Sequence, residues 1–232
     1  MSSENSTVRN WRDVEPKKVA LGVEEFELIV PEETPAKRVC VRLLVIEPES
    51  TWKPEKFTGE IFYYFLAGNG ILLWHRYNTD LPFLIDNDTT GWIPGTHTYS
   101  FENTGEGPMR CLVIFCKTDE IYHWRDGSLG KLDALTPISR RVSDTIYSSG
   151  VTGARRISGG NYQVLAQGKA KKEHWHDEEV IYIVRGKGKL ISSGKEYVLK
   201  AGSAAHTPSN IKHRLINIGQ DMFGYLGFEF RG

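Results

Sequence analysis

The stretch from Gly168 to Gly186 reads G-KAKKE-HWHDEE-VIYIVR-G and carries two histidines one residue apart, followed by a pair of glutamates. Alternate side chains of an extended strand point to the same side, so His174 and His176 should face one way and Trp175 the other. Two converging imidazoles next to a carboxylate form half of a metal site. This stretch therefore predicts a strand that contributes metal ligands from one face.

A second stretch downstream supplies the other half of the expected site. From Gly202 to Asn217 the sequence reads G-SAAHT-P-SNIK-H-RLI-N, and His213 ends a turn rich in Gly, Pro and Asn. Three neutral imidazole nitrogens and one carboxylate suit a divalent transition metal and leave positions open for water, substrate or dioxygen. We expect one such ion, with Fe, Mn, Ni and Zn as candidates and Fe slightly favoured.

The two stretches together resemble the paired signature motifs of the cupin superfamily. The first motif is Gly, five residues, His-x-His, a short gap, Glu, six residues and Gly; the second is Gly, five residues, Pro-x-Gly, two residues, His, three residues and Asn. The matching residues are Gly168, His174, His176, Glu179, Gly186, Gly202, Pro208, His213 and Asn217. The resemblance implies that the metal ligands are His174, His176, Glu179 and His213.

The sequence departs from these motifs at two places. Asn210 stands where glycine is usual, and asparagine tolerates a left-handed backbone better than most residues. Only two residues separate His176 from Glu179, where three or four are usual. We prefer Glu179 as the carboxylate ligand because its distance to Gly186 matches the motif, and Glu178 is the alternative if the hairpin is shortened.

An internal repeat covers both halves of the chain. EIFYYFLAGNGILLW at 60–74 resembles EEVIYIVRGKGKLIS at 178–192, and GWIPGTHTYSFENTG at 91–105 resembles AHTPSNIKHRLINIG at 205–219. The first pair is offset by 118 residues and the second by 114, which places 118 − 114 = 4 extra residues in the N-terminal copy. We interpret NTDLPFLIDNDTT, residues 78–90, as a loop that holds them. Such a duplication predicts two copies of one β-domain.

The predicted fold is therefore all-β, with two tandem cupin jelly-roll β-barrels, which is the arrangement that the resemblance implies for a bicupin. Apolar runs of five to ten residues between turn signals favour strands, and no segment has a sustained period of 3.6. The expected division is an N-terminal arm at 1–25, a degenerate cupin barrel at 26–117, a connector at 118–149 and a metal-binding cupin barrel at 150–232.

The N-terminal copy lacks the histidines of the first motif, where it reads TWKPEKFTGE. In its second motif Tyr99 aligns with His213, and His97 lies two positions earlier, on the same face as Tyr99. One imidazole with Glu60 is a poor metal site, so we expect a metal-free barrel in which His97 remains a candidate pocket residue.

Other side chains of the C-terminal copy are candidates for its pocket. His206 lies two residues before Pro208 and could line the cavity, ligate weakly or be a buried, hydrogen-bonded histidine. One of Tyr162 and Gln163 should face inward, while Tyr182 is expected to pack between sheets. The motifs do not identify a catalytic acid or base.

The composition limits the partners of the chain. Lys and Arg number 29 and Asp and Glu 29, so nothing suggests a nucleic-acid or anionic-membrane surface. No apolar run is long enough for a transmembrane helix, and the polar first residues do not resemble a secretory signal. The three cysteines, an odd number in apolar runs, favour buried free thiols. We expect a cytoplasmic protein that binds neither nucleic acid nor membrane.

These features together favour a metal-dependent bicupin enzyme that acts on a small polar or anionic metabolite. Fe(II) dioxygenase-type chemistry at the C-terminal cupin is the first choice, because three His and one Glu with open positions suit iron and dioxygen. The alternatives are a non-redox metal-dependent lyase, isomerase or hydrolase, or a cupin that binds a small molecule without turnover. The resemblance also implies a homodimer.

Overall fold

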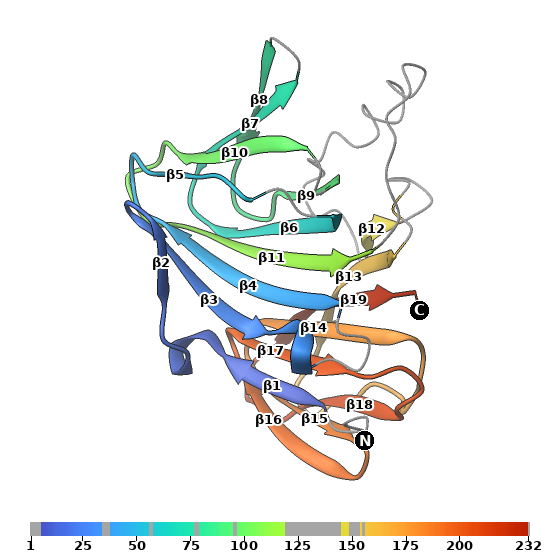
Figure 1. Ribbon diagram of the computed structural model, residues 1–232. Coiled ribbons are helices and arrows are strands. Elements are labelled where there is room, and N and C mark those ends of the chain that lie inside the picture. The colour runs from blue at the N-terminus through green and yellow to red at the C-terminus, as the bar shows by residue number, and fades with distance from the viewer. Residues whose placement is uncertain are drawn as a thin grey trace.

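The structure of the chain is a computed structural model (Figure 1). It describes residues 6–33, 38–55, 58–76, 79–94, 97–118, 145–148, 154 and 156–231. Most of the expected connector, residues 119–144, lies outside the described part of the chain.

The N-terminal unit consists of two facing sheets. The larger has six strands in the order β2 (Lys17–Ala20), β3 (Val23–Ile29), β4 (Val39–Ile46), β11 (Met109–Lys117), β6 (Gly59–Ala67) and β9 (Thr90–Pro94). The smaller has four strands in the order β5 (Thr51–Trp52), β10 (Thr98–Asn103), β7 (Gly70–Arg76) and β8 (Thr79–Ile85). A 3₁₀ turn, η2 (Pro31–Glu33), follows β3.

The C-terminal unit repeats this plan. Its larger sheet has the order β1 (Thr7–Asn10), β17 (Ser203–Thr207), β14 (Glu178–Arg185), β19 (Phe223–Phe230), β13 (Ile157–Leu165) and β12 (Thr145–Ser148). Its smaller sheet has the order β16 (Lys195–Lys200), β15 (Lys187–Ser192) and β18 (His213–Asn217). The 3₁₀ turn η1 (Trp11–Asp13) follows β1.

The all-β, tandem jelly-roll-like fold predicted from the sequence is confirmed. In both units the two sheets face each other without closing into one continuous hydrogen-bonded cylinder. The strands of the sequence repeat take equivalent places: β6 and β9 lie in one large sheet as β14 and β17 do in the other, and β7 pairs with β10 as β15 does with β18.

Two equivalent asparagines make the same hydrogen bonds in the two units. The side-chain amide of Asn103 donates to the carbonyl of Ile46 at 2.7 Å, and that of Asn217 donates to the carbonyl of Leu165 at 2.9 Å. Each asparagine oxygen also accepts the backbone N–H two residues further on, at 2.9 Å in both units. The asparagine that ends the second motif therefore ties the small sheet to the large one, which is a structural role.

The interpretation of residues 78–90 as a loop is wrong. Residues Thr79–Ile85 form β8, which pairs along its length with β7 and ends the smaller sheet. An edge strand is hydrogen-bonded on one side only, so β8 accommodates Pro82. The prediction failed because the Asn and Asp residues at the ends of this stretch indicate turns more strongly than its short apolar run indicates a strand.

The two units pack through their large sheets (Figure 1). Phe62 of β6 and Phe228 of β19 are both fully buried, with ring centroids 4.7 Å apart, and they belong to one apolar core that spans both units. Tyr182 lies in this core, which confirms that it packs between sheets. Consequently one face of the β13–β19–β14–β17 sheet serves the interface and the other lines the C-terminal interior.

The N-terminal segment crosses to the C-terminal unit. β1 adds an antiparallel edge to β17, and Figure 1 shows it among the strands of that unit. The Asn10 amide donates to the Ala201 carbonyl and the Ser203 hydroxyl, each at 3.1 Å. Trp11 packs edge-on against Phe26 of β3 at 5.3 Å, so the first part of the expected arm joins the two units, while β2 and the start of β3 belong to the N-terminal sheet.

The three cysteines are free and buried, as the sequence predicted. Burial raises the pKa of Cys40 to about 11 and that of Cys116 to about 12. They therefore stay protonated near neutral pH and behave as small apolar side chains.

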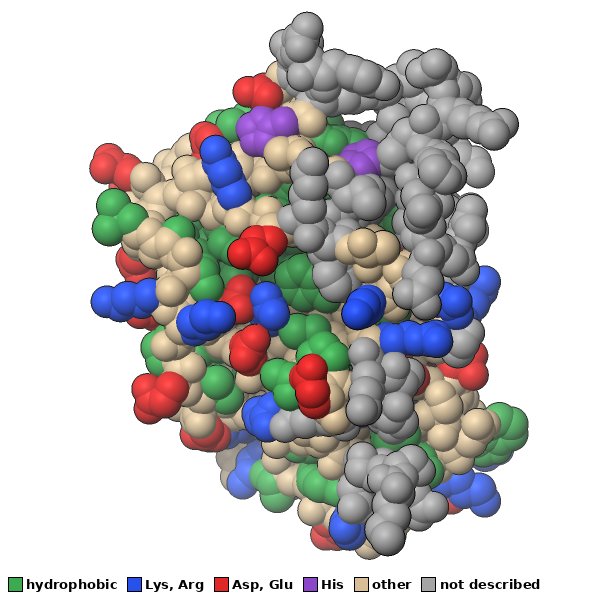
Figure 2. Space-filling model, viewed as in Figure 1, with side chains coloured by type: hydrophobic (Ala, Val, Ile, Leu, Met, Phe, Trp, Pro, Cys, Tyr) green, Lys and Arg blue, Asp and Glu red, His purple; other side chains and the backbone are tan. Residues whose placement is uncertain are grey.

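The described surface carries charged side chains of both signs. Among the described residues, no helix has the length and apolarity that a bilayer crossing requires. On the face in Figure 2, acidic and basic side chains are interspersed.

Candidate metal centre

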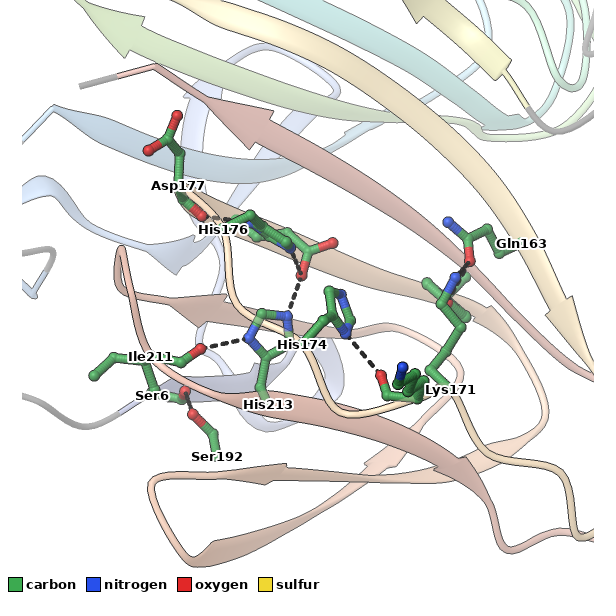
Figure 3. A network of polar contacts seen from close by, with 12 residues as sticks. Ser6, Gln163, Lys171, His174, His176, Asp177, Ser192, Ile211 and His213 are labelled. Atoms are coloured by element: carbon green, nitrogen blue, oxygen red, sulfur yellow. Dashed lines mark hydrogen bonds and ion pairs between the residues drawn. The ribbon is translucent and has the colours of Figure 1, made fainter.

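Three histidines converge in the C-terminal unit (Figure 3). The ring centroid of His174 lies 5.2 Å from that of His176 and 4.5 Å from that of His213, and one nitrogen from each ring lies within 4.8 Å of the others. Within the described part of the chain, no other group of three or more potential metal ligands is as compact. The expected strand at the two histidines is wrong: His174 forms only an isolated bridge with His213, and β14 begins at Glu178. Trp175 between the histidines is 60% exposed.

Backbone hydrogen bonds bring the two motifs together. His174 and His213 exchange N–H···O bonds of 3.1 and 2.9 Å, which sets their side chains next to each other between the first motif and β18. The backbone N–H of Asn210 donates to the His176 carbonyl at 2.8 Å. Asn210 has φ +62°, which confirms that asparagine replaces glycine here in a left-handed turn.

The second nitrogen of each ring fixes its tautomer. Nδ1 of His174 lies 2.9 Å from the Lys172 carbonyl, Nδ1 of His176 lies 2.6 Å from the Asp177 carbonyl, and Nδ1 of His213 lies 2.8 Å from the Ile211 carbonyl. A carbonyl only accepts, so in each neutral ring Nδ1 carries the hydrogen and Nε2 keeps its lone pair. All three Nε2 atoms are thus available as ligands.

Glu179 joins the three histidines, and Glu178 does not. The Oε2 atom of Glu179 lies 3.1 Å from His213 Nε2 and 3.6 Å from His176 Nε2. Glu178, on the opposite face of β14, meets His206 Nε2 at 2.5 Å. The structure therefore places the carboxylate preferred from motif spacing in the cluster and directs the alternative into the interface between the units.

The electrostatics of the cluster favour a cation. Burial alone would lower the pKa of His213, but the contact with Glu179 and its negative charge outweigh burial and raise it. For His174, burial is the main cause of a lowered pKa. A field that favours a proton on buried His213 Nε2 also favours a metal ion at that nitrogen.

Gly227 makes room for the Glu179 carboxylate. It lies on β19 opposite Ile181 of β14, and a Cβ at this position would approach Glu179 Oε1 to 2.9 Å. The sequence motifs do not include Gly227, so it was missed. A glycine inside the strand-like run FGYLGFEF is the signal that could have indicated it, because such a glycine often marks a close approach of another group.

His206 is a buried, hydrogen-bonded histidine, one of the three roles considered for it. Its side chain is fully buried with Glu178 and does not reach the cluster. Tyr162 also faces the shared core, while Gln163 accepts a hydrogen bond from Tyr225 at 2.8 Å on the inner face of the sheet. Gln163 is thus the inward member of the pair.

The N-terminal unit has apolar groups where the cluster has ligands. By the strand register, Ile61 takes the place of Glu179 and Tyr99 that of His213. Tyr99 packs edge-on against Tyr63 at 5.6 Å and tilts against Phe101 at 5.7 Å, so aromatic rings fill this interior.

The polar candidates of the N-terminal unit serve other contacts. Glu60 turns to the other face, where it accepts backbone N–H groups of Arg156 and Ile157 at 2.8–3.2 Å. The ring of His97 lies 5.1 Å from that of Trp74. No described side chain gives His97 a metal-ligand cluster.

Comparisons with known proteins concern the fold and one segment of the chain. Residues 161–226 match the cupin domain family. Three solved structures of oxalate decarboxylase OxdC from Bacillus subtilis, two of them variants and one from work on its Mn(II) centres, each have a TM-score of 0.73. They are 13%, 11% and 12% identical, and each alignment covers 96% of this chain and 76% of the other. No curated protein matches the sequence.

Residues 161–226 therefore form a cupin domain, and all three histidines of the cluster lie within it. For the rest of the chain, the oxalate decarboxylase structures show a shared fold.

Proposed function

We propose that the C-terminal unit holds one divalent transition-metal ion through Nε2 of His174, His176 and His213 and the carboxylate of Glu179. The observation that carries this proposal is that Nδ1 of each ring faces a backbone carbonyl and that one nitrogen from each ring lies within 4.8 Å of the others. Nε2 of His213 is buried, and its contact with Glu179 lacks hydrogen-bond geometry, so an ion would satisfy this atom. The residues present therefore fit the ion.

We propose further that the protein is an enzyme for a small anionic substrate. A divalent ion with one carboxylate and three neutral imidazoles leaves a net charge of about +1, which attracts carboxylates and enolates. When bound, the ion would supply Lewis-acid or redox chemistry at positions open to substrate. The chain itself fixes the ligand geometry on hydrogen-bonded strands and keeps the imidazoles in one tautomer.

Fe(II) dioxygenase-type chemistry is the first specific candidate, on the grounds of donor set and open positions. A manganese-dependent lyase is the second, because similar folds include an oxalate decarboxylase studied for its Mn(II) centres. Under either proposal the active unit is residues 150–232, and the barrel at 26–117 holds no metal. We also predict that the protein is cytoplasmic and forms a homodimer.

Metal loading followed by oxygen uptake tests the proposal. Purified protein incubated with Fe(II), Mn(II), Ni(II) or Zn(II) and desalted should retain about one ion per chain, as expected for one such site. Oxygen consumption with small carboxylic acids would support the dioxygenase, while carbon dioxide release without oxygen consumption would support the lyase. Protein that retains no ion after loading with any of the four metals would contradict the whole proposal.

Gly227→Ala should weaken metal binding without unfolding the chain. The new methyl group would push against Glu179 Oε1, the movable end of a flexible side chain, and displace the carboxylate from the histidines. Disturbing a residue that positions a ligand typically costs about 10- to 100-fold in metal affinity. Competition titration with a chelating dye measures this loss. The control for glycine replacement in general is Gly194→Ala, because a Cβ there meets nothing within 4 Å, although φ is +73°. Equal affinities for wild type and Gly227→Ala would contradict the assignment of Glu179.

A further inference from the structure

A second polar cluster lies beside the histidines and consists of Lys171, Gln163 and Tyr225. The Tyr225 hydroxyl donates to Gln163 Oε1 at 2.8 Å, and Lys171 Nζ donates to the same oxygen (Figure 3). An ammonium group only donates, so it fixes the amide with its oxygen towards Lys171 and Tyr225. The amide NH₂ of Gln163 therefore points away from both and keeps its two donors for another partner.

The large sheet connects this cluster to the metal centre. Gln163 on β13 pairs with Tyr225 on β19, and Tyr225 precedes Gly227, the glycine against which Glu179 lies, by two residues. Side chains two apart on a strand share a face and are separated by about 7 Å. Tyr225 is buried, and burial followed by the negative charge of Glu179 raises its pKa. Tyr225, the member of the second cluster on β19, therefore lies on the same face as the proposed ligand Glu179 and close to it.

The small sheet connects the cluster to the metal centre a second time. The backbone N–H of Lys171 donates to the Leu215 carbonyl of β18 at 2.8 Å, in the segment that pairs His174 with His213. Figure 3 shows the Lys171 side chain reaching from this segment towards Gln163, on the large sheet. Lys171 therefore spans the two sheets beside the histidines.

No carboxylate among the described residues neutralises the charge of Lys171. Lys189 lies 2.9 Å from Glu196 and Lys200 lies 3.5 Å from Asp13, whereas no carboxylate of the described residues comes within ion-pair distance of Lys171. A partly buried, unneutralised ammonium next to amide donors attracts an anion, because nearby low-dielectric surface strengthens its field.

We propose that Lys171 and Gln163 bind a second carboxylate of a small dicarboxylic acid whose first carboxylate lies at the metal centre. This inference rests on the proposed metal function and adds the substrate class. Lys171 supplies charge, the Gln163 amide supplies two N–H donors, and Tyr225 is a positioning residue that holds the amide through its oxygen.

Binding of simple acids to the metal-loaded protein tests this proposal. Affinities for oxalate, malonate, succinate and acetate are measured by calorimetry for wild type, Lys171→Gln and Lys189→Gln, with the metal content of each sample determined in parallel. Lys189→Gln removes the same charge from β15 and controls for the general electrostatic field.

The expected result is a selective loss. Lys171→Gln should bind at least one of the three diacids about 10- to 100-fold more weakly, as loss of a charge-assisted hydrogen bond predicts. Acetate, with one carboxylate for the metal, should change less than about twofold, and Lys189→Gln should match wild type for every acid. Metal content should be the same in all three proteins.

Three results would overturn the inference. They are a metal-loaded wild type that binds no diacid, a Lys171→Gln variant that binds all three as wild type does, and a Lys189→Gln variant that loses as much affinity as Lys171→Gln. Each of these results leaves the metal proposal intact if the ion is present. Wild-type protein that retains no ion defeats the metal proposal itself, and with it the inference.

Discussion

His213→Ala is expected to abolish metal binding by the C-terminal unit. His213 is 2% exposed, and its Nε2 is the buried atom that contacts Glu179, so its loss removes one of four proposed ligands and leaves the carboxylate facing two partly exposed rings. Loss of a positioning residue already costs about 10- to 100-fold in affinity, so loss of a ligand should cost more than about 100-fold. Elemental analysis after metal loading and desalting measures the effect.

Tyr99→Phe is the matched control for this experiment. Tyr99 takes the place of His213 in the N-terminal unit, and the change removes only its hydroxyl while keeping the ring against Tyr63. The variant should retain about as much metal as wild type. If Tyr99→Phe lost the ion and His213→Ala kept it, the metal would lie in the wrong unit for this account. Unfolding curves of both variants in EDTA separate loss of ligand from loss of fold.

Phe228→Ala is expected to cause the largest loss of stability. Phe228 is fully buried where the two large sheets meet, 4.7 Å from the Phe62 ring, so its truncation leaves a cavity between the units. Truncation of a buried phenylalanine to alanine costs about 3–5 kcal/mol in the free energy of unfolding. Urea unfolding followed by fluorescence measures this change.

Leu84→Ala provides the comparison for Phe228→Ala. Leu84 on β8 is 80% exposed, and its truncation should change the free energy of unfolding by about 0.5 kcal/mol or less. A loss below about 1 kcal/mol for Phe228→Ala would mean that the large sheets do not pack on each other. Phe62 and Phe228 are in contact. The combination of Phe62→Ala with Phe228→Ala should therefore lower the free energy of unfolding by less than the sum of the two single substitutions.

The sequence predicted the histidine cluster because its signal is local. The His-x-His spacing brought His174 and His176 together, although they do not lie on the expected strand, and the spacing of the second motif placed His213 at the start of a strand. The choice of Glu179 over Glu178 followed from the distance to Gly186 and is consistent with the geometry. These features depend on a few residues in succession, which a single sequence shows directly.

What the sequence did not reveal depends on contacts between distant segments. The pairing of β1 with β17 joins residues nearly 200 positions apart, and nothing in its four residues specifies that partner. The face on which Glu60 lies follows from the strand register, which also gives Ile61 the place of Glu179. Lys171 is not one of the motif residues, and only the fold places Gln163 beside it.

The most direct test of the metal centre is an anomalous difference map from crystals of the protein loaded with Mn(II). The account predicts one strong peak per chain, about 2.0–2.3 Å from Nε2 of His174, His176 and His213 and from a Glu179 oxygen. A map with no peak among these four side chains, or with its strongest peak in the N-terminal unit, would contradict it.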